Sequence, residues 1–282
     1  MSSELTFSVV IPVYNNPTLA TRAIFSVLRQ TESVKEIILV DDASFVECAK
    51  KYALLVGRCR SQIPIILHTL PKNVGPGLAR QAGASLASGT HVCFLDADDV
   101  WHRQKIGLVR RLIAETGAEL VGHQRLWKFH YHKNLLSEQL ENVAARSLKK
   151  IDFLIRNPMP TSSITARAEI AKIMFDFGGR KSEDYMALIY STKLTKNILF
   201  LDLPLCAAFK PPSGHSGEGA DQMAIYISSA ANIEILKKSK VVSFWDVWIF
   251  YFFLAVKMPS GMIRNLVFQK MSLRQKSRIN AD

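Results

Sequence analysis

The stretch Phe7-Ser-Val-Val-Ile-Pro-Val13 is a nearly continuous run of apolar residues, and Tyr14-Asn15 follows it directly. A run of this kind is typical of a strand that is buried on both faces of a parallel sheet. Pro17 comes shortly afterwards and suits the first turn of a helix, where a missing N–H costs no hydrogen bond. The sequence therefore predicts a buried strand followed by a helix at the start of the chain.

The same alternation continues to about residue 125. Further strand-like segments are Glu36–Val40, Ile63–Leu67, His91–Leu95 and Glu119–Gly122, and helix-like segments are Val46–Val56, Leu78–Ala87 and Trp101–Thr116. This succession predicts an α/β fold with a mostly parallel sheet flanked by helices on both faces. Beyond residue 125 the pattern is less regular. Helices are expected there over Arg146–Ile155, Asp184–Thr195 and Gln222–Lys238. The last of these belongs to a C-terminal helical extension.

Composition excludes several classes of protein. Apolar residues make up 48% of the chain and charged residues 21%, which excludes intrinsic disorder and collagen-like sequence. The four cysteines form no Cys-x-x-Cys pair, which argues against a structural zinc site or a disulfide scaffold and favours a cytosolic protein. Residues 1–4 carry neither the basic nor the apolar part of a secretory signal, so none is expected.

The charge of the chain is unevenly placed. The formal net charge is +12, and residues 121–282 hold 23 of the 36 basic residues but only 13 of the 24 acidic ones. A basic half suggests an anionic partner. The charge alone does not decide whether this partner is nucleic acid, a membrane surface or a phosphorylated substrate.

Polar clusters follow three of the predicted strands. They are Tyr14-Asn15, Asp41-Asp42 and Asp96-Ala97-Asp98-Asp99. Ligands of open α/β sheets gather at the carboxyl ends of the strands. Asp and Asn also cap helices and start turns, so any one cluster has an ordinary structural explanation. The three clusters together favour a ligand site.

The Asp96–Asp99 cluster predicts a metal site. In extended backbone the side chains of Asp96 and Asp98 project to the same side, where two carboxylates repel each other unless a cation joins them. Oxygen ligands alone suit Mg²⁺ or Mn²⁺, which share their coordination with substrate phosphates. The alternative is that these acids cap the helix expected from Trp101. Asp99 fits that capping role and would leave Asp96 and Asp98 for the metal.

Several motifs, in this order, resemble those of the family-two glycosyltransferases, which have the A-type glycosyltransferase fold. They are SVVIPVYN (Ser8–Asn15), VDDAS (Val40–Ser44), Asn73-Val-Gly75 with Ala79-Arg80, and FLDADD (Phe94–Asp99). The resemblance is strong over residues 6–125 and weaker as far as the His215 loop. It implies a nucleotide-sugar-binding part in residues 1–125 and an acceptor-binding part with the catalytic base in residues 126–220. Residues 221–282 would then form a helical, membrane-associating extension.

The resemblance also implies roles for single residues. Pro12 and Tyr14 would flank the nucleotide base, and Asp42 with Asp41 would accept hydrogen bonds from uracil and ribose. The residues implied to bind the nucleotide are Pro12, Tyr14, Asn15, Asp41, Asp42, Asn73, Gly75, Arg80 and Asp96. The residues implied to hold Mn²⁺ or Mg²⁺ are Asp98 as the principal ligand, Asp96 and the loop residue His215.

Sugar transfer also needs a base that removes the proton of the acceptor hydroxyl, an effect typically of about 10²–10⁴-fold. Glu183-Asp184 resembles the Glu-Asp motif of inverting family members, which implies Asp184 as the base and Glu183 as a neighbour that positions the acceptor. Without the resemblance, two acids are equally typical of the first turn of an exposed helix.

The apolar and aromatic run Val241–Val256 indicates whether the protein binds a membrane. It is shorter than the roughly twenty residues of a membrane span. Followed by a basic tail, it suits an interfacial helix on anionic lipid, and a buried helix packed on the domain is the alternative. The resemblance implies a UDP-sugar donor and a lipid-linked saccharide acceptor at the inner face of the cytoplasmic membrane. Gln124-Arg-Leu-Trp127 lacks the Gln-x-x-Arg-Trp motif of processive members, which favours transfer of a single sugar.

Two other functions compete with this one. A sugar nucleotidyltransferase also uses paired carboxylates and Mg²⁺ but releases pyrophosphate. A nucleic-acid-binding protein would suit the charge of +12. It predicts basic and aromatic residues interleaved on one surface. Here the acids stand at the strand ends and the aromatic residues form one apolar block, so no nucleic-acid partner is expected. The oligomeric state stays open.

Overall fold

The computed structural model describes residues 4–59, 63–127, 144–177, 181–208 and 222–257. Its strands are β1 (Phe7–Val13), β2 (Glu36–Asp41), β3 (Ile65–Thr69), β4 (His91–Phe94), β5 (Asp99–Trp101), β6 (Leu120–Trp127), β7 (Ala145–Ser147), β8 (Thr165–Arg167) and β9 (Ile198–Ala208). Its helices are α1 (Pro17–Leu28), α2 (Val46–Arg58), α3 (Pro76–Leu86), α4 (Lys105–Thr116), α5 (Lys150–Ile155), α6 (Ala168–Ala171), α7 (Glu183–Leu194), α8 (Gln222–Lys238) and α9 (Phe244–Lys257), with a short 3₁₀ turn at Thr161–Ser163.

One sheet runs through the described chain in the order β3-β2-β1-β4-β8-β6-β9-β5, and β7 also pairs with β9. The first four of these strands are parallel, so their carboxyl ends meet at one edge of the sheet. Beyond β4 the sheet is mixed. β8 is antiparallel to β4 and β6, β9 is parallel to β6, and β5 and β7 are antiparallel to β9. The predicted α/β fold is confirmed, and its parallel part is the N-terminal half.

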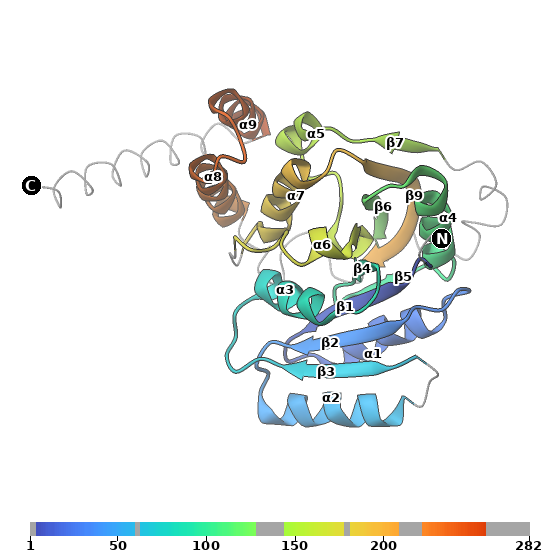
Figure 1. Cartoon of the computed structure of the whole chain (residues 1–282). Coiled ribbons are helices and arrows are strands. Elements are labelled where there is room, and N and C mark those ends of the chain that lie inside the picture. Colours follow the sequence, from blue (N-terminus) through green and yellow to red (C-terminus); the bar gives the residue numbers. More distant parts are fainter. Residues whose placement is uncertain (1–3, 60–62, 128–143, 178–180, 209–221, 258–282) are drawn as a thin grey trace, which may run out of the picture.

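Helices cover both faces of the sheet, as Figure 1 shows. Alternate residues of β1 serve two cores, because successive side chains of a strand point to opposite faces. Val10 packs in the core that includes residues of α3, α7 and α9. Val9 and Ile11 pack in the core that includes residues of α1, α2 and α4. Burial on both faces explains why this strand is apolar at every position but Ser8.

The helix predicted over Trp101–Thr116 begins later than expected. Asp99–Trp101 forms β5, which pairs with the end of β9, and α4 starts only at Lys105 after Gln104. Asp99 therefore does not cap a helix, and the capping prediction is wrong. The physical reason is that these residues gain strand hydrogen bonds to β9, while the Trp101 side chain is buried. The helix predicted over Arg146–Ile155 is likewise split, into β7 and α5.

The C-terminal helices α8 and α9 pack on α7 and α5 at the end of the molecule opposite to α2 (Figure 1). Within the described ranges, no helix combines the length and the apolar character that crossing a bilayer requires.

Gly83 of α3 marks a close approach of this helix to the sheet. A Cβ at this position would lie 2.5 Å from Val10 Cγ1 and 2.9 Å from Val40 Cγ2. We expect Gly83→Ala to lower the free energy of unfolding by about 1–3 kcal/mol, because an added methyl overpacks the core. Urea unfolding followed by circular dichroism measures this. Gly57→Ala in α2 is the matched control, since nothing lies within 4 Å of its Cβ. Equal effects of the two substitutions would contradict the close packing.

Candidate active site

The carboxyl ends of the parallel strands open onto a cavity of about 1250 Å³. Residues at the ends of β1, β2 and β4 line it, and so do residues at the start of α7. The predicted site residues that line the cavity are Pro12, Tyr14, Asp42, Asn73, Gly75, Arg80, Asp96, Asp98, Glu183 and Asp184. Segments distant in the sequence therefore meet around one space. His215 lies outside the described residues.

Asn15 and Asp41 are not among the described residues that line the cavity. The side-chain oxygen of Asn15 accepts a hydrogen bond from the Phe45 N–H at 2.8 Å, and its backbone has a positive φ of 50°. Asp41 is buried and accepts a hydrogen bond from the Ser44 N–H at 3.0 Å. Both side chains brace the turns that follow β1 and β2, and their predicted contact with the nucleotide stays a prediction.

Asp42 ties the end of β2 to the loop before α3. Its carboxylate accepts hydrogen bonds from the N–H groups of Val74 at 2.7 Å and Gly75 at 2.9 Å. The side-chain amide of Asn73 donates to the Asp42 carbonyl at 3.1 Å. Gly75 has a φ of 91°, which glycine adopts without the steric cost that a Cβ would add. The loop therefore runs close to Asp42 along the cavity.

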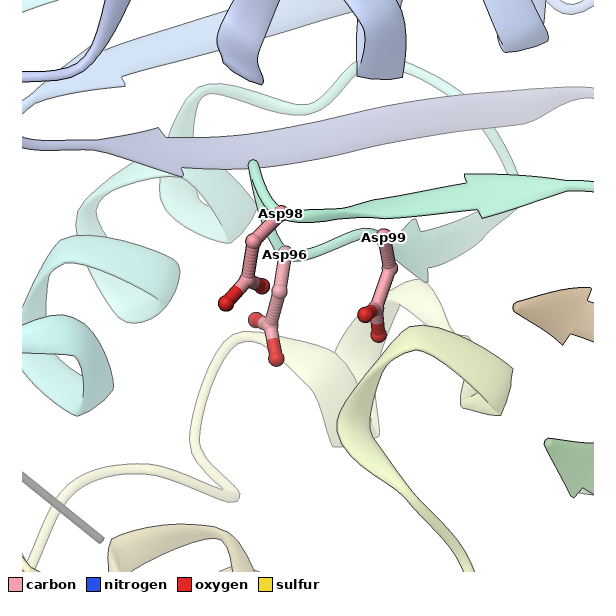
Figure 2. A group of neighbouring side chains, drawn as sticks. All are labelled: Asp96, Asp98 and Asp99. Carbon is pink, nitrogen blue, oxygen red and sulfur yellow. The ribbon is translucent and has the colours of Figure 1, made fainter. Parts of the chain in front are cut away.

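Three carboxylates follow β4. Asp96, Asp98 and Asp99 each offer an oxygen, and these oxygens all lie within 4.8 Å of one another. Figure 2 shows their side chains pointing to the same side of the loop between β4 and β5. Burial, together with the charges of Asp96 and Asp98, raises the pKa of Asp99 to about 7. The cluster therefore concentrates negative charge that a cation would relieve.

Ser162 of the 3₁₀ turn holds this loop. Its hydroxyl donates a hydrogen bond to Asp99 Oδ2 and accepts one from the Asp96 N–H at 3.1 Å. The indole N–H of Trp101 donates to the Ser162 carbonyl at 2.7 Å. Ser162 was not predicted as a site residue. Nothing in the sequence around it indicates that it contacts Asp96 and Asp99.

The cluster fits a divalent cation. Its donors are all carboxylate oxygens, the type that Mg²⁺ and Mn²⁺ prefer. Asp99 Oδ1 is buried and lacks a hydrogen-bond partner among the described residues. Asp96 and Asp98 line the cavity, so they are the carboxylates that would face both an ion and a bound substrate.

Arg80 joins the carboxylate cluster to α7. It is buried, and its guanidinium lies 2.6 Å from Asp96 Oδ1 and 3.0 Å from Glu183 Oε1. Burial disfavours the charge, but the two carboxylates outweigh it and raise the pKa of Arg80 above its ordinary value. Burial also raises the pKa of Glu183 to about 7, with the Arg80 charge acting against this shift. Arg80 therefore connects the loop after β4 with the start of α7.

Asp184 stands in the first turn of α7. Its Oδ2 accepts a hydrogen bond from the side-chain amide of Asn157 at 3.1 Å, and its Oδ1 accepts one from the Tyr185 N–H at 2.8 Å. Both donors orient the carboxylate at the cavity wall. Asn157 was not predicted as a site residue, because Asn157-Pro158-Met159-Pro160 shows in the sequence only as a break between elements.

A comparison with models of protein families identifies the family of this chain. Residues 8–174, which are more than half of the chain, match the model described as Glycosyl transferase family 2. The chain belongs to glycosyl transferase family 2. It is therefore a glycosyltransferase, as the motifs at the strand ends predicted.

This family 2 enzyme is also similar in sequence to proteins that are named as glycosyltransferases. The amylovoran biosynthesis glycosyltransferase AmsB of Erwinia amylovora is 29% identical over 238 residues, which cover 80% of this chain and 78% of AmsB. An uncharacterized glycosyltransferase of Rickettsia conorii is 35% identical over 114 residues, which are 40% of this chain and 18% of that protein. Among solved structures, S. aureus TarS 1-349 in complex with UDP-GlcNAc has a TM-score of 0.63 and 20% identity. That match covers 82% of this chain and 67% of the TarS chain, and it shows the A-type glycosyltransferase fold.

Apolar and aromatic side chains of this family 2 enzyme gather around Tyr185, the neighbour of Asp184. The Tyr185 hydroxyl donates a hydrogen bond to the Leu154 carbonyl at 3.2 Å, and the Tyr185 ring lies 6.0 Å from that of Phe250. Leu154 of α5, Tyr185 of α7, and Phe250 and Leu254 of α9 line the cavity. Two cationic residues, Arg156 and Lys181, line it as well. Gln124 and Arg125 of β6 also line the cavity, although their sequence does not match the motif of processive members.

Proposed function

We propose that this glycosyltransferase transfers a single sugar, with inversion and with the help of Mn²⁺ or Mg²⁺, from a UDP-sugar to a saccharide acceptor. The observation that carries the proposal is a single cavity lined both by Asp96 and Asp98, which follow β4, and by Asp184 at the start of α7. The distinct placement of the two carboxylate groups suits two roles, ion binding and proton removal. The relation to AmsB, which is named for amylovoran biosynthesis, supports a place in cell-surface polysaccharide synthesis.

We assign the donor to the cavity wall formed within residues 1–125. Tyr14 is 49% exposed beside Pro12 and offers its ring to the nucleotide base. Asp42 and the loop from Asn73 to Gly75 present polar groups next to it. The complex of TarS with UDP-GlcNAc, a protein of similar fold, supports a UDP-sugar as the donor.

The divalent ion would be held by Asp98 and Asp96, with His215 as a further contact to the ion or the diphosphate. When bound, such an ion acts as a Lewis acid that stabilises the charge on the departing diphosphate. Arg80 keeps Asp96 at the cavity through its ion pair of 2.6 Å.

Asp184 would act as the base, within residues 126–220. Its carboxylate takes the proton of the acceptor hydroxyl as the hydroxyl oxygen forms its bond to the anomeric carbon and the bond to the diphosphate breaks. Asn157 and the Tyr185 N–H keep the carboxylate in place for this step. Glu183, held by Arg80, positions the acceptor beside the base.

The acceptor we propose is a lipid-linked saccharide, bound by a protein that is cytoplasmic and peripheral on the inner face of the cytoplasmic membrane. Support comes from the apolar side chains around Tyr185 and from the cations Arg156 and Lys181, which suit a phosphate beside an apolar chain. Residues 221–282, which include α8 and α9, form the membrane-associating part in this proposal.

A donor screen tests the function. The protein is incubated with a panel of nucleotide sugars, a lipid-linked saccharide extract and Mn²⁺ or Mg²⁺, and the released nucleotide is identified by chromatography. We expect UDP, released only with a divalent ion and faster with acceptor than without it. Release of pyrophosphate would instead identify a nucleotidyltransferase. A salt-sensitive gel shift with DNA or RNA, in the absence of any nucleotide release, would support the nucleic-acid-binding alternative.

A further inference from the structure

Helix α9 carries two apolar faces with different surroundings. Phe250 is buried, and with Leu254 it lines the cavity. On other sides of the same helix, Trp245 is 73%, Trp248 60% and Phe252 63% exposed. We call Phe244, Trp245, Trp248, Phe252 and Val256 the aromatic face of α9; all five are exposed large apolar side chains.

The spacing of these residues makes the aromatic face continuous. Phe244, Trp248, Phe252 and Val256 follow one another at intervals of four, so they form one stripe along the helix, with Trp245 beside its first turn. The rings of Phe244 and Trp248 lie 6.2 Å apart, and those of Phe244 and Trp245 lie 5.7 Å apart. A cluster of exposed large aromatic side chains of this kind marks an interaction surface rather than scattered surface residues.

Cations stand beside the aromatic face. Lys237, Lys238 and Lys240 at the end of α8 are exposed, and Lys237 Nζ lies 5.5 Å from the centroid of the Phe244 ring. Asp246, the one acidic residue in the sequence of α9, is buried and paired with Lys150 Nζ at 2.6 Å. The charge next to the aromatic face is therefore positive.

We propose that the aromatic face of α9 and the three lysines form the site at which the protein docks on an anionic lipid bilayer. Tryptophan and phenylalanine are favoured at the boundary between headgroups and acyl chains, and lysines are attracted by anionic headgroups. A second protein is less well matched, because lysine is depleted from protein–protein interfaces. A helix with this composition lies in the plane of the interface with its apolar face embedded.

Docking in this way orients the cavity. The wall formed by Phe250 and Leu254 and the aromatic face belong to one helix, whose diameter with side chains is about 10–12 Å. This wall of the cavity therefore lies within about one helix diameter of the bilayer surface. This consequence rests on the proposed function, since it is useful to an enzyme whose acceptor is anchored in lipid; the docking itself needs no sugar transfer.

Vesicle binding by the full chain tests the proposal. Vesicles of phosphatidylcholine with 30% phosphatidylglycerol, roughly the charge density at which polybasic segments bind, are compared with pure phosphatidylcholine. We expect the wild-type protein to sediment with the anionic vesicles, with a blue shift of its tryptophan fluorescence. Trp245→Ser combined with Trp248→Ser should weaken this binding at least roughly tenfold. Lys237→Gln combined with Lys238→Gln should weaken binding and reduce its dependence on salt.

The matched control is Leu54→Ser on α2, an exposed apolar side chain at the other end of the molecule. It should bind vesicles like the wild type. Circular dichroism and transfer to a detergent-solubilised acceptor, measured for each variant, separate loss of docking from loss of fold or of activity. Unchanged vesicle binding by the double tryptophan variant would overturn the proposal. The proposal would also be overturned if the wild-type protein bound no vesicles and formed a dimer that the double tryptophan variant did not form. The aromatic face would then join two copies of the chain.

Discussion

Replacement of Asp98 by asparagine is expected to lower kcat for sugar transfer by at least about 10³-fold, which corresponds to about 4 kcal/mol of transition-state stabilisation. The substitution removes one of three carboxylates whose oxygens lie within 4.8 Å of one another. An amide is a weaker ligand for a hard cation than a carboxylate, so less of the departing charge is stabilised. The measurement is kcat as a function of Mn²⁺ concentration, with the melting temperature recorded beside it.

The fold should survive this change. Asp98 is only half-buried, and its charge contributes to the raised pKa of Asp99, so removing the charge relieves repulsion. Glu115→Gln, an exposed acid on α4, is the control for a general loss of negative charge and should keep wild-type activity. Transfer by Asp98→Asn within tenfold of the wild type would contradict a metal site at this cluster.

The second large effect is expected for Asp184→Asn, which should lower kcat by about 10²–10⁴-fold while UDP affinity stays within twofold. The amide keeps the shape of the side chain but cannot accept the proton of the acceptor hydroxyl. Asp184 lies at the start of α7, so loss of its charge should cost at most about 1 kcal/mol of stability. Single-turnover transfer and calorimetric titration with UDP and Mn²⁺ give the two quantities.

The two variants should fail in different ways. Asp98→Asn should lose metal-dependent nucleotide binding, whereas Asp184→Asn should keep it and lose only the transfer step. Full transfer by Asp184→Asn would remove this residue from the role of base and direct attention to Glu183, which shares the first turn of α7.

The parallel part of the sheet was predictable because a strand buried on both faces appears in the sequence as a short run of apolar residues. β1, β2 and β4 are mostly apolar, and polar clusters follow at their carboxyl ends. β5 and β9 were not predicted. β5 has three residues, too few to show a period, and β9 contains Asp202 and Pro204, which are unfavourable inside a strand. β9 forms because β6 pairs with it across register shifts near Gln124, a tertiary effect.

The site was predictable where its residues belong to ordered motifs. Residues supplied by other segments were not: Ser162 reaches Asp96 across 66 positions of sequence, and Asn157 reaches Asp184 across 27. Serine and asparagine occur in many turns, so their type carries no indication of such contacts. Arg80 is an intermediate case, since its place among the nucleotide-binding residues was expected but its ion pair with Glu183 appears only in three dimensions.

The loop that carries Asp96 and Asp98 is attached to the sheet at both ends, and Asp99 begins the strand that follows it. β4 enters it paired with β1, and β5 leaves it paired with β9. The conformational entropy of this loop is therefore lost once, during folding, and not again whenever an ion or a nucleotide arrives. In the proposed function, ion binding would then change the charge of the loop far more than its shape. Under the proposed function, the enzyme would release its product and accept the next donor without rebuilding the site that we propose for the phosphates.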